Sequence, residues 1–105
     1  MKKTKKILKV KQLENKNQFL IIANDGVYFQ SYSSLIAYWD YAKQLLTVGC
    51  DWDYSNTTRK HLYIFIKEYC YLPEIDAALY NTNNKAKTII KLIKDGVIEY
   101  DPEMR

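Results

Sequence analysis

The stretch that decides the fold is QFLIIANDGVYFQSY, residues Gln18–Tyr32. Its two ends, Gln18–Ala23 and Val27–Tyr32, are rich in the β-branched and aromatic residues that strands favour. Between them, Asn24-Asp25-Gly26 supplies small residues that tolerate a positive φ, as tight hairpin turns require. The sequence therefore predicts a hairpin of two antiparallel strands.

An edge strand is predicted before this hairpin, over Lys6–Leu13. Leu8 and Val10 fall on one side of it, and Lys9 and Lys11 fall on the other. One side of the predicted edge strand is therefore basic.

A second hairpin is predicted after the first, with strands Leu35–Trp39 and Leu45–Val48 around Asp40–Gln44. The stretch Ser34–Leu46 also fits an amphipathic helix, because its apolar residues permit both periods. We favour the two strands.

Helical spacing follows the second hairpin. The apolar stripe of the first helix consists of Thr58, Leu62, Phe65, Ile66 and Tyr69. Pro73 ends this helix because proline lacks an amide donor. Glu74–Tyr80 fits a short helix, and Asn83–Asp95 fits a longer one that stops at Gly96. Val97–Tyr100 is predicted as a short strand.

Strands that precede helices predict an α+β fold. We expect an antiparallel β-meander of about five strands, then two or three helices packed on one face, then the short C-terminal strand. With 105 residues and 48% hydrophobic content, residues 1–105 are predicted to form a single domain. Met1–Lys5 and Pro102–Arg105 are expected to be flexible.

Positive charge is concentrated at the N-terminus. Residues 1–16 hold seven Lys and one Glu, a net charge of +6, whereas the rest holds nine basic and eleven acidic residues, a net charge of −2. The apolar runs are short, so no membrane-spanning segment is predicted. Two cysteines are too few for a disulfide framework, and the N-terminus lacks the apolar core of a signal peptide. We therefore expect a cytoplasmic protein.

The start of the first helix carries several side chains suited to capping. Tyr54-Ser55-Asn56-Thr57-Thr58 offers hydroxyls that accept hydrogen bonds from the first free amides. Tyr54 or Trp52 is expected to cover the helix start from outside, as in a hydrophobic staple. His61, one turn further on, is expected to hydrogen-bond locally or to pack at the sheet edge. These residues have a structural explanation of their own.

The same residues also carry a family resemblance. Phe29-Gln30-Ser31-Tyr32, then Asp51–His61, then Phe65 resemble a family of small uncharacterised domains found in phages and mobile elements of bacteria. The family's pattern is a Ser-Tyr pair in a strand, then Tyr-Ser-x-Thr-Thr-x-x-His and a downstream Phe, and the match covers roughly Lys9–Leu72. The resemblance implies a shape and a bacterial or phage setting, and it implies no catalytic residue.

Residues suited to catalysis or metal binding are sparse. His61 is the single histidine, and neither Cys50 nor Cys70 has helical contact spacing to it, which disfavours a Cys–His nucleophile and a zinc site. Asp51 and Asp53 form a carboxylate pair, but the spacing of a calcium-binding loop is absent. The three glycines are isolated, so no phosphate-binding loop is present. The sequence predicts no enzyme, no cofactor and no metal site.

Tyrosine is the most unusual component, with ten copies in an aromatic content of 14%. Tyr28 and Tyr32 are predicted on the less apolar face of one strand, and Tyr38 on that of the next. An open row of tyrosines suits a protein interface, and it also suits the stacking of unpaired bases. If the helices cover this face instead, the row is part of the core.

The first function we consider is binding without catalysis. A phage or mobile-element protein of this size can inhibit a host protein by steric occupation, as an anti-CRISPR inhibitor of a Cas effector does. The three tyrosines then contact the host protein, together with acidic residues that face a basic nucleic-acid groove. These acidic residues are Asp95, Glu99, Asp101 and Glu103.

The alternative is a nucleic-acid-binding accessory protein that combines the tyrosine face with an N-terminal lysine arm. The lysines of the arm are Lys2, Lys3, Lys5, Lys6, Lys9 and Lys11. A second basic patch on the last helix consists of Lys85, Lys87, Lys91 and Lys94. An enzyme with a site built from distant residues is the least favoured function.

Overall fold

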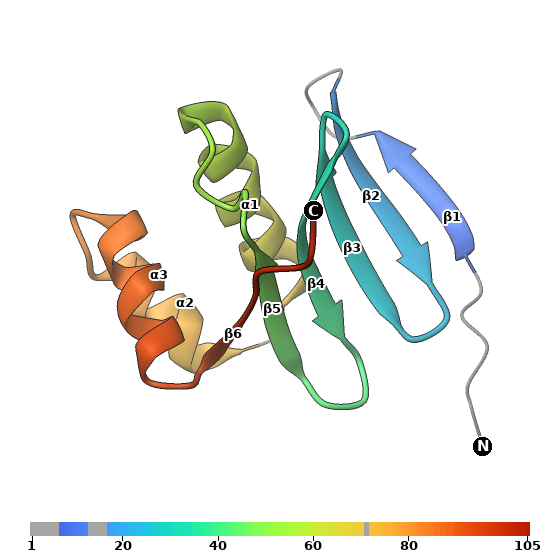
Figure 1. Cartoon of the computed structure of the whole chain (residues 1–105). Coiled ribbons are helices and arrows are strands. Elements are labelled where there is room, and N and C mark those ends of the chain that lie inside the picture. The colour runs from blue at the N-terminus through green and yellow to red at the C-terminus, as the bar shows by residue number, and fades with distance from the viewer. Residues whose placement is uncertain (1–6, 13–16, 71) are drawn as a thin grey trace.

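A six-stranded sheet forms the centre of the computed structural model, which describes residues 7–12, 17–70 and 72–105 (Figure 1). The strands lie in sequence order, and each of the first five pairs antiparallel with its neighbour. They are β1 (Ile7–Gln12), β2 (Gln18–Ala23), β3 (Gly26–Ser31), β4 (Ser34–Asp40), β5 (Leu45–Gly49) and β6 (Ile98–Asp101). The predicted α+β fold with its meander is confirmed. The stretch Ser34–Leu46, which also fits a helix, forms the β4–β5 hairpin.

The last strand pairs with its neighbour in parallel, whereas all pairs of the meander are antiparallel. β6 pairs parallel to β5, with Leu46 opposite Ile98 and Val48 opposite Tyr100. A parallel neighbour requires a crossover connection, and the three helices provide it. The helices therefore link the two strands at this edge of the sheet.

The helices are α1 (Asn56–Tyr69), α2 (Pro73–Tyr80) and α3 (Lys85–Lys94). Ser55 caps α1 by accepting a hydrogen bond from the amide of Thr58 at 3.1 Å, and Asn84 caps α3 through the amide of Lys87 at 3.0 Å. Pro73 occupies the first turn of α2, where its missing amide costs little. All three helices lie on one side of the sheet (Figure 1).

The core lies between the helices and this side of the sheet. Alternate residues of the central strands, such as Leu20, Phe29 and Leu46, point toward the helices and are fully buried. Phe65 of α1 stacks against Phe29, with 5.8 Å between the ring centroids. Trp52 also belongs to this cluster, whereas Tyr54 is 76% exposed. Of the two aromatic residues expected to cover the start of α1, the structure therefore buries Trp52.

The C-terminal residues contact the loop that follows β5. The amide of Cys50 donates to the carbonyl of Met104 at 3.3 Å, and the amide of Met104 donates to the carbonyl of Asp101 at 3.2 Å. The flexibility expected for Pro102–Arg105 stays a prediction. Met1–Lys5, also expected to be flexible, lie outside the described residues.

The first hairpin turn depends on glycine for a reason that differs from the predicted one. Positive φ occurs among the described residues at Tyr32, Gln44 and Gly96, and not at Gly26. A Cβ on Gly26 would collide with the carbonyl oxygen of Trp39 and lie 2.6 Å from the ring of Tyr38. The glycine is needed because β4 approaches so closely.

We expect Gly26→Ala to lower the free energy of unfolding by about 1–3 kcal/mol, because the new methyl group collides with the backbone of β4, which must shift to accommodate it. Urea denaturation followed by far-UV circular dichroism measures the change. Gly96→Asn is the control, because Gly96 has φ +78° with open space around it, a conformation that asparagine tolerates. If Gly26→Ala is as stable as the wild type, this would contradict the close approach of the β4 backbone to Gly26.

Burial separates the two free cysteines. Cys70, at the end of α1, is buried, and burial together with nearby Asp76 raises the pKa of its thiol. Cys50 is half-buried and its sulfur lies 3.7 Å from the carbonyl oxygen of Met104.

Native protein treated with a chromogenic disulfide reagent at neutral pH should therefore release the colour of a single thiol, that of Cys50. The second thiol should react only after denaturant is added. A Cys50→Ser variant should leave native protein without a rapid phase. Rapid labelling of both thiols in the wild type would show that the core around Cys70 opens readily.

Candidate functional site

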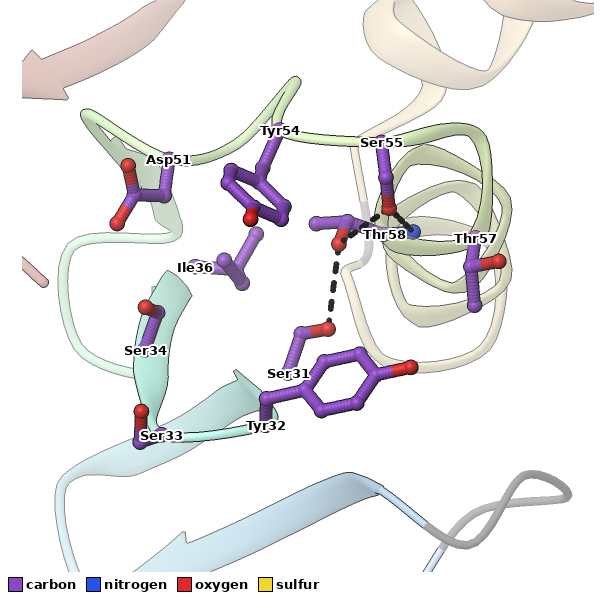
Figure 2. Close-up of a pocket in the computed structure, with 10 residues that line it drawn as sticks. All are labelled: Ser31, Tyr32, Ser33, Ser34, Ile36, Asp51, Tyr54, Ser55, Thr57 and Thr58. Atoms are coloured by element: carbon purple, nitrogen blue, oxygen red, sulfur yellow. Dashed lines mark hydrogen bonds between the residues drawn. The ribbon is translucent and has the colours of Figure 1, made fainter.

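One pocket lies between the β3–β4 turn and the start of α1 (Figure 2). Its volume is about 640 Å³, within the range of small-molecule sites. The residues that line it come from two stretches far apart in sequence, and most of them carry a hydroxyl group. They are Ser31, Tyr32, Ser33, Ser34, Ile36, Asp51, Tyr54, Ser55, Thr57 and Thr58. We call this cavity the hydroxyl-lined pocket.

A row of three hydrogen-bonded side chains forms the inner wall of the pocket. The hydroxyl of Ser55 donates to that of Thr58 at 3.1 Å, and the hydroxyls of Thr58 and Ser31 are hydrogen-bonded at 3.2 Å (Figure 2). Ser31 and Thr58 are both buried. This hydroxyl chain joins β3 to the first turn of α1, so the Ser-Tyr and Tyr-Ser-x-Thr-Thr parts of the sequence pattern meet here.

Thr58→Val should cost about 1–3 kcal/mol of stability, because it leaves the buried hydroxyl of Ser31 without its partner. Thr57→Val is the matched control, a neighbouring threonine that is only half-buried. Denaturant unfolding of both variants gives the comparison.

A double variant, Ser31→Ala with Thr58→Val, should lose less stability than the sum of the two single variants, since the two side chains bond to each other. Additive losses would mean that the hydroxyls act independently.

Two tyrosines lie at the rim of the pocket. Tyr32 is 54% exposed and Tyr54 is 76% exposed. Tyr32 has φ +55°, in the left-handed region that is unfavourable for a residue with a side chain, and its amide donates to the carbonyl of Asn17 at 2.7 Å. The turn conformation thus carries Tyr32 to the pocket and away from the row with Tyr28 that the sequence predicts.

Asp51 is the one charged residue among those that line the pocket. Its carbonyl accepts a hydrogen bond from the amide of Tyr54 at 3.1 Å, which fixes the loop before α1. Asp53 is exposed and does not line the pocket, so the two carboxylates diverge. Within the described ranges no group of three or more His, Cys, Asp or Glu residues is placed to hold a metal ion.

His61 lies in α1, about one turn after its start, and does not line the pocket. Its Nδ1 is 2.9 Å from the carbonyl oxygen of Thr57, so Nδ1 carries the proton and donates it. The ring is buried, and Nε2 has no hydrogen-bond partner among the residues that the structure describes. The histidine hydrogen-bonds locally, as one of the two sequence expectations states.

A second surface of interest lies on the opposite side of the sheet. Strand register places Val10, Ile21, Tyr28 and Tyr38 in one row across β1 to β4. The rings of Tyr28 and Tyr38 stack with 4.4 Å between centroids, and both residues are half-buried. No described helix covers this row, which we call the helix-free face.

The phenol of Tyr38 stays protonated on this face. Burial raises its pKa, and the neighbouring carboxylates of Asp25 and Asp40 raise it further. The hydroxyl donates to the carbonyl of Asp25 at 3.2 Å. The hydrogen bond to Asp25 fixes the direction of the Tyr38 hydroxyl, and the ring lies against that of Tyr28.

The structure does not bring the described lysines of the predicted arm, Lys9 and Lys11, to the same face as the tyrosines. Lys9 pairs with Ile22 and Lys11 with Leu20, so both lysines project to the helix-bearing side. Lys2, Lys3, Lys5 and Lys6 lie outside the described residues. The second basic patch belongs to α3, on the helix-bearing side.

Three of the four predicted acidic residues gather along β6 and just beyond it. Glu99 accepts a hydrogen bond from the hydroxyl of Thr47 at 3.3 Å, on the side of the helix-free face. Asp101 accepts from the amide of Glu103 at 2.9 Å. Asp95 is the C-cap residue of α3 and lies apart from them.

Sequence reasoning assigned no binding role to the residues of the pocket other than Tyr32. The available signal was the density of hydroxyl residues in two short stretches, 31–34 and 54–58. That signal does not tell which hydroxyls are buried in the wall and which face the cavity, because the contact between the stretches is tertiary.

Comparison with known proteins finds a family model that covers most of the chain. A model described as a family of unknown function (DUF8033) matches residues 1–87. No curated protein and no solved structure matches the sequence. Among the described residues, no helix has the length and apolar character needed to span a membrane.

Proposed function

This chain belongs to the family of unknown function DUF8033, and because membership assigns no activity, we propose a function from its surfaces. The protein binds a host protein through the helix-free face of its sheet and inhibits that protein by steric occupation, without catalysis. We further propose that the protein comes from a phage or mobile element and acts against host defence, for example by inhibiting a Cas effector.

The observation that carries the proposal is the uncovered aromatic centre of the sheet. Val10 is 59% exposed, and Ile21, Tyr28 and Tyr38 are only half-buried although they lie on inner strands. Phe19 on β2 and Leu35 on β4 lie on the same face, and both are the register partners of Gln30 on β3. Contiguous apolar and aromatic surface of this kind is typical of protein interfaces, where tyrosine contributes large contact area at little entropic cost.

The charges at the border of this face support one kind of partner over another. Asp40, Glu99 and Asp101 occupy its border on β4 and β6, whereas Lys9 and Lys11 project to the other side. An acidic border attracts a partner with a basic rim and repels a phosphate backbone. This favours a protein partner whose own basic surface binds nucleic acid, over nucleic acid itself.

We expect substitutions on the helix-free face to weaken partner binding about tenfold or more, as the loss of a central interface contact does. Val10→Glu and Tyr28→Ala test this face. Ile90→Glu on α3, where the side chain is 43% exposed, is the matched control on the other side of the molecule. Tagged wild-type protein retrieves the partner from host lysate, and calorimetry with the purified partner measures each affinity.

The proposal is supported if the two face variants lose affinity while Ile90→Glu keeps it, and if added salt weakens the wild-type complex. It is overturned if the three variants bind alike, or if no host protein is retained in stoichiometric amount. Tight binding of single-stranded RNA or DNA at low salt that deletion of residues 1–6 abolishes would establish the nucleic-acid function in its place.

A further inference from the structure

We propose that the hydroxyl-lined pocket is a binding site for a neutral saccharide, a mono- or disaccharide unit with vicinal hydroxyl groups. The site is separate from the proposed protein interface, because the pocket lies between the β3–β4 turn and the start of α1, whereas Tyr28 and Tyr38 lie on the helix-free face.

The chemistry of the wall selects the class of ligand. Ser, Thr and Tyr hydroxyls each donate one hydrogen bond and accept others, and eight of the ten lining residues carry such a group. The bonds between Ser55, Thr58 and Ser31 engage three of these hydroxyls with one another. Ser33 and Ser34 line the cavity on one side of this chain, and Thr57 lines it on the α1 side (Figure 2). A ligand that also donates and accepts at every polar atom matches this wall, and a sugar ring has that property.

Charged ligands match the pocket less well. An anion such as phosphate accepts hydrogen bonds only, and it meets the carboxylate of Asp51 in a lining that contains no Lys, Arg or His. An ammonium or guanidinium group donates only, and Asp51 is the single acidic group that it finds there. For a neutral sugar, the same carboxylate accepts from two neighbouring hydroxyls in charge-assisted hydrogen bonds.

The two rim tyrosines supply the apolar part of the site. An aromatic face is negative and attracts the C–H face of a sugar ring. Tyr54 and Tyr32 lie on opposite sides of the hydroxyl chain, and Asp51, Ser33 and Ser34 lie beyond it, away from α1 (Figure 2). Both rings are more than half exposed, so they are available for stacking. The turn conformation of Tyr32 brings its side chain to the rim of the pocket.

The test uses the full chain and a panel of named sugars: glucose, N-acetylglucosamine, lactose, maltose, cellobiose and chitobiose. Heteronuclear NMR titration should show saturable shifts at the amides of Ser33, Asp51 and Thr57 with at least one of them. Asp51→Asn should weaken that binding by about tenfold, since it removes charge-assisted hydrogen bonds. Tyr54→Ala should weaken it by a similar factor.

Two matched controls separate the site from general effects. Asp53→Asn changes the exposed carboxylate next to the pocket, and Tyr80→Ala removes a ring that is 88% exposed elsewhere. Both should bind as the wild type does, and thermal unfolding shows whether each variant is folded.

Absence of saturable shifts with every sugar of the panel overturns the proposal, as does equal weakening by the pocket variants and their controls. Adenosine monophosphate and uridine monophosphate are titrated alongside the sugars. Preferential binding of either nucleotide also overturns the saccharide proposal, in favour of a nucleotide ligand. None of these results affects the protein-interface proposal, whose variants lie on the opposite side of the sheet.

Discussion

The contact between α1 and β3 is the constraint on which the rest of the structure depends. Phe65 stacks on Phe29 in the middle of the core, and the hydroxyls of Thr58 and Ser31 are bonded at its end. The apolar contact supplies the stabilisation, and the buried hydrogen bond fixes how far α1 lies along the strand. With α1 fixed in this way, the loop before it forms one wall of the hydroxyl-lined pocket and the β3–β4 turn forms the other.

The same packing gives the molecule two dissimilar sides. Placing all three helices on one side buries that face of every inner strand, while the helix-free face keeps Ile21, Tyr28 and Tyr38 only half-buried. A strand alternates its side chains between the faces, so polar and charged groups of β1 fall opposite the tyrosines. A polar pocket and a half-buried aromatic row therefore lie at different places in one small domain.

Local sequence signals were sufficient for most of the fold. The strand-favouring residues of Gln18–Ala23, the stripe that includes Leu62 and Phe65, and the cap at Ser55 each predict an element from neighbouring residues, and all three elements are observed. What escaped prediction depends on tertiary contacts. The reason for Gly26 is the nearness of β4, and the position of Tyr32 follows from its turn conformation. The hydroxyl-lined pocket was missed for the same reason, and so was the separation of Lys9 and Lys11 from the tyrosines, which register decides.

The parallel pairing of β6 with β5 has a consequence for the order of folding. Hairpins close over a few residues, whereas Thr47 and Glu99, neighbours on these two strands, are 52 positions apart. During synthesis, the meander can assemble as it leaves the ribosome, but the outer backbone groups of β5 stay open until the crossover helices have been made. For that interval the nascent chain presents the bare edge of β5 to its surroundings, and β6, the last of the six strands to emerge, then pairs with that edge.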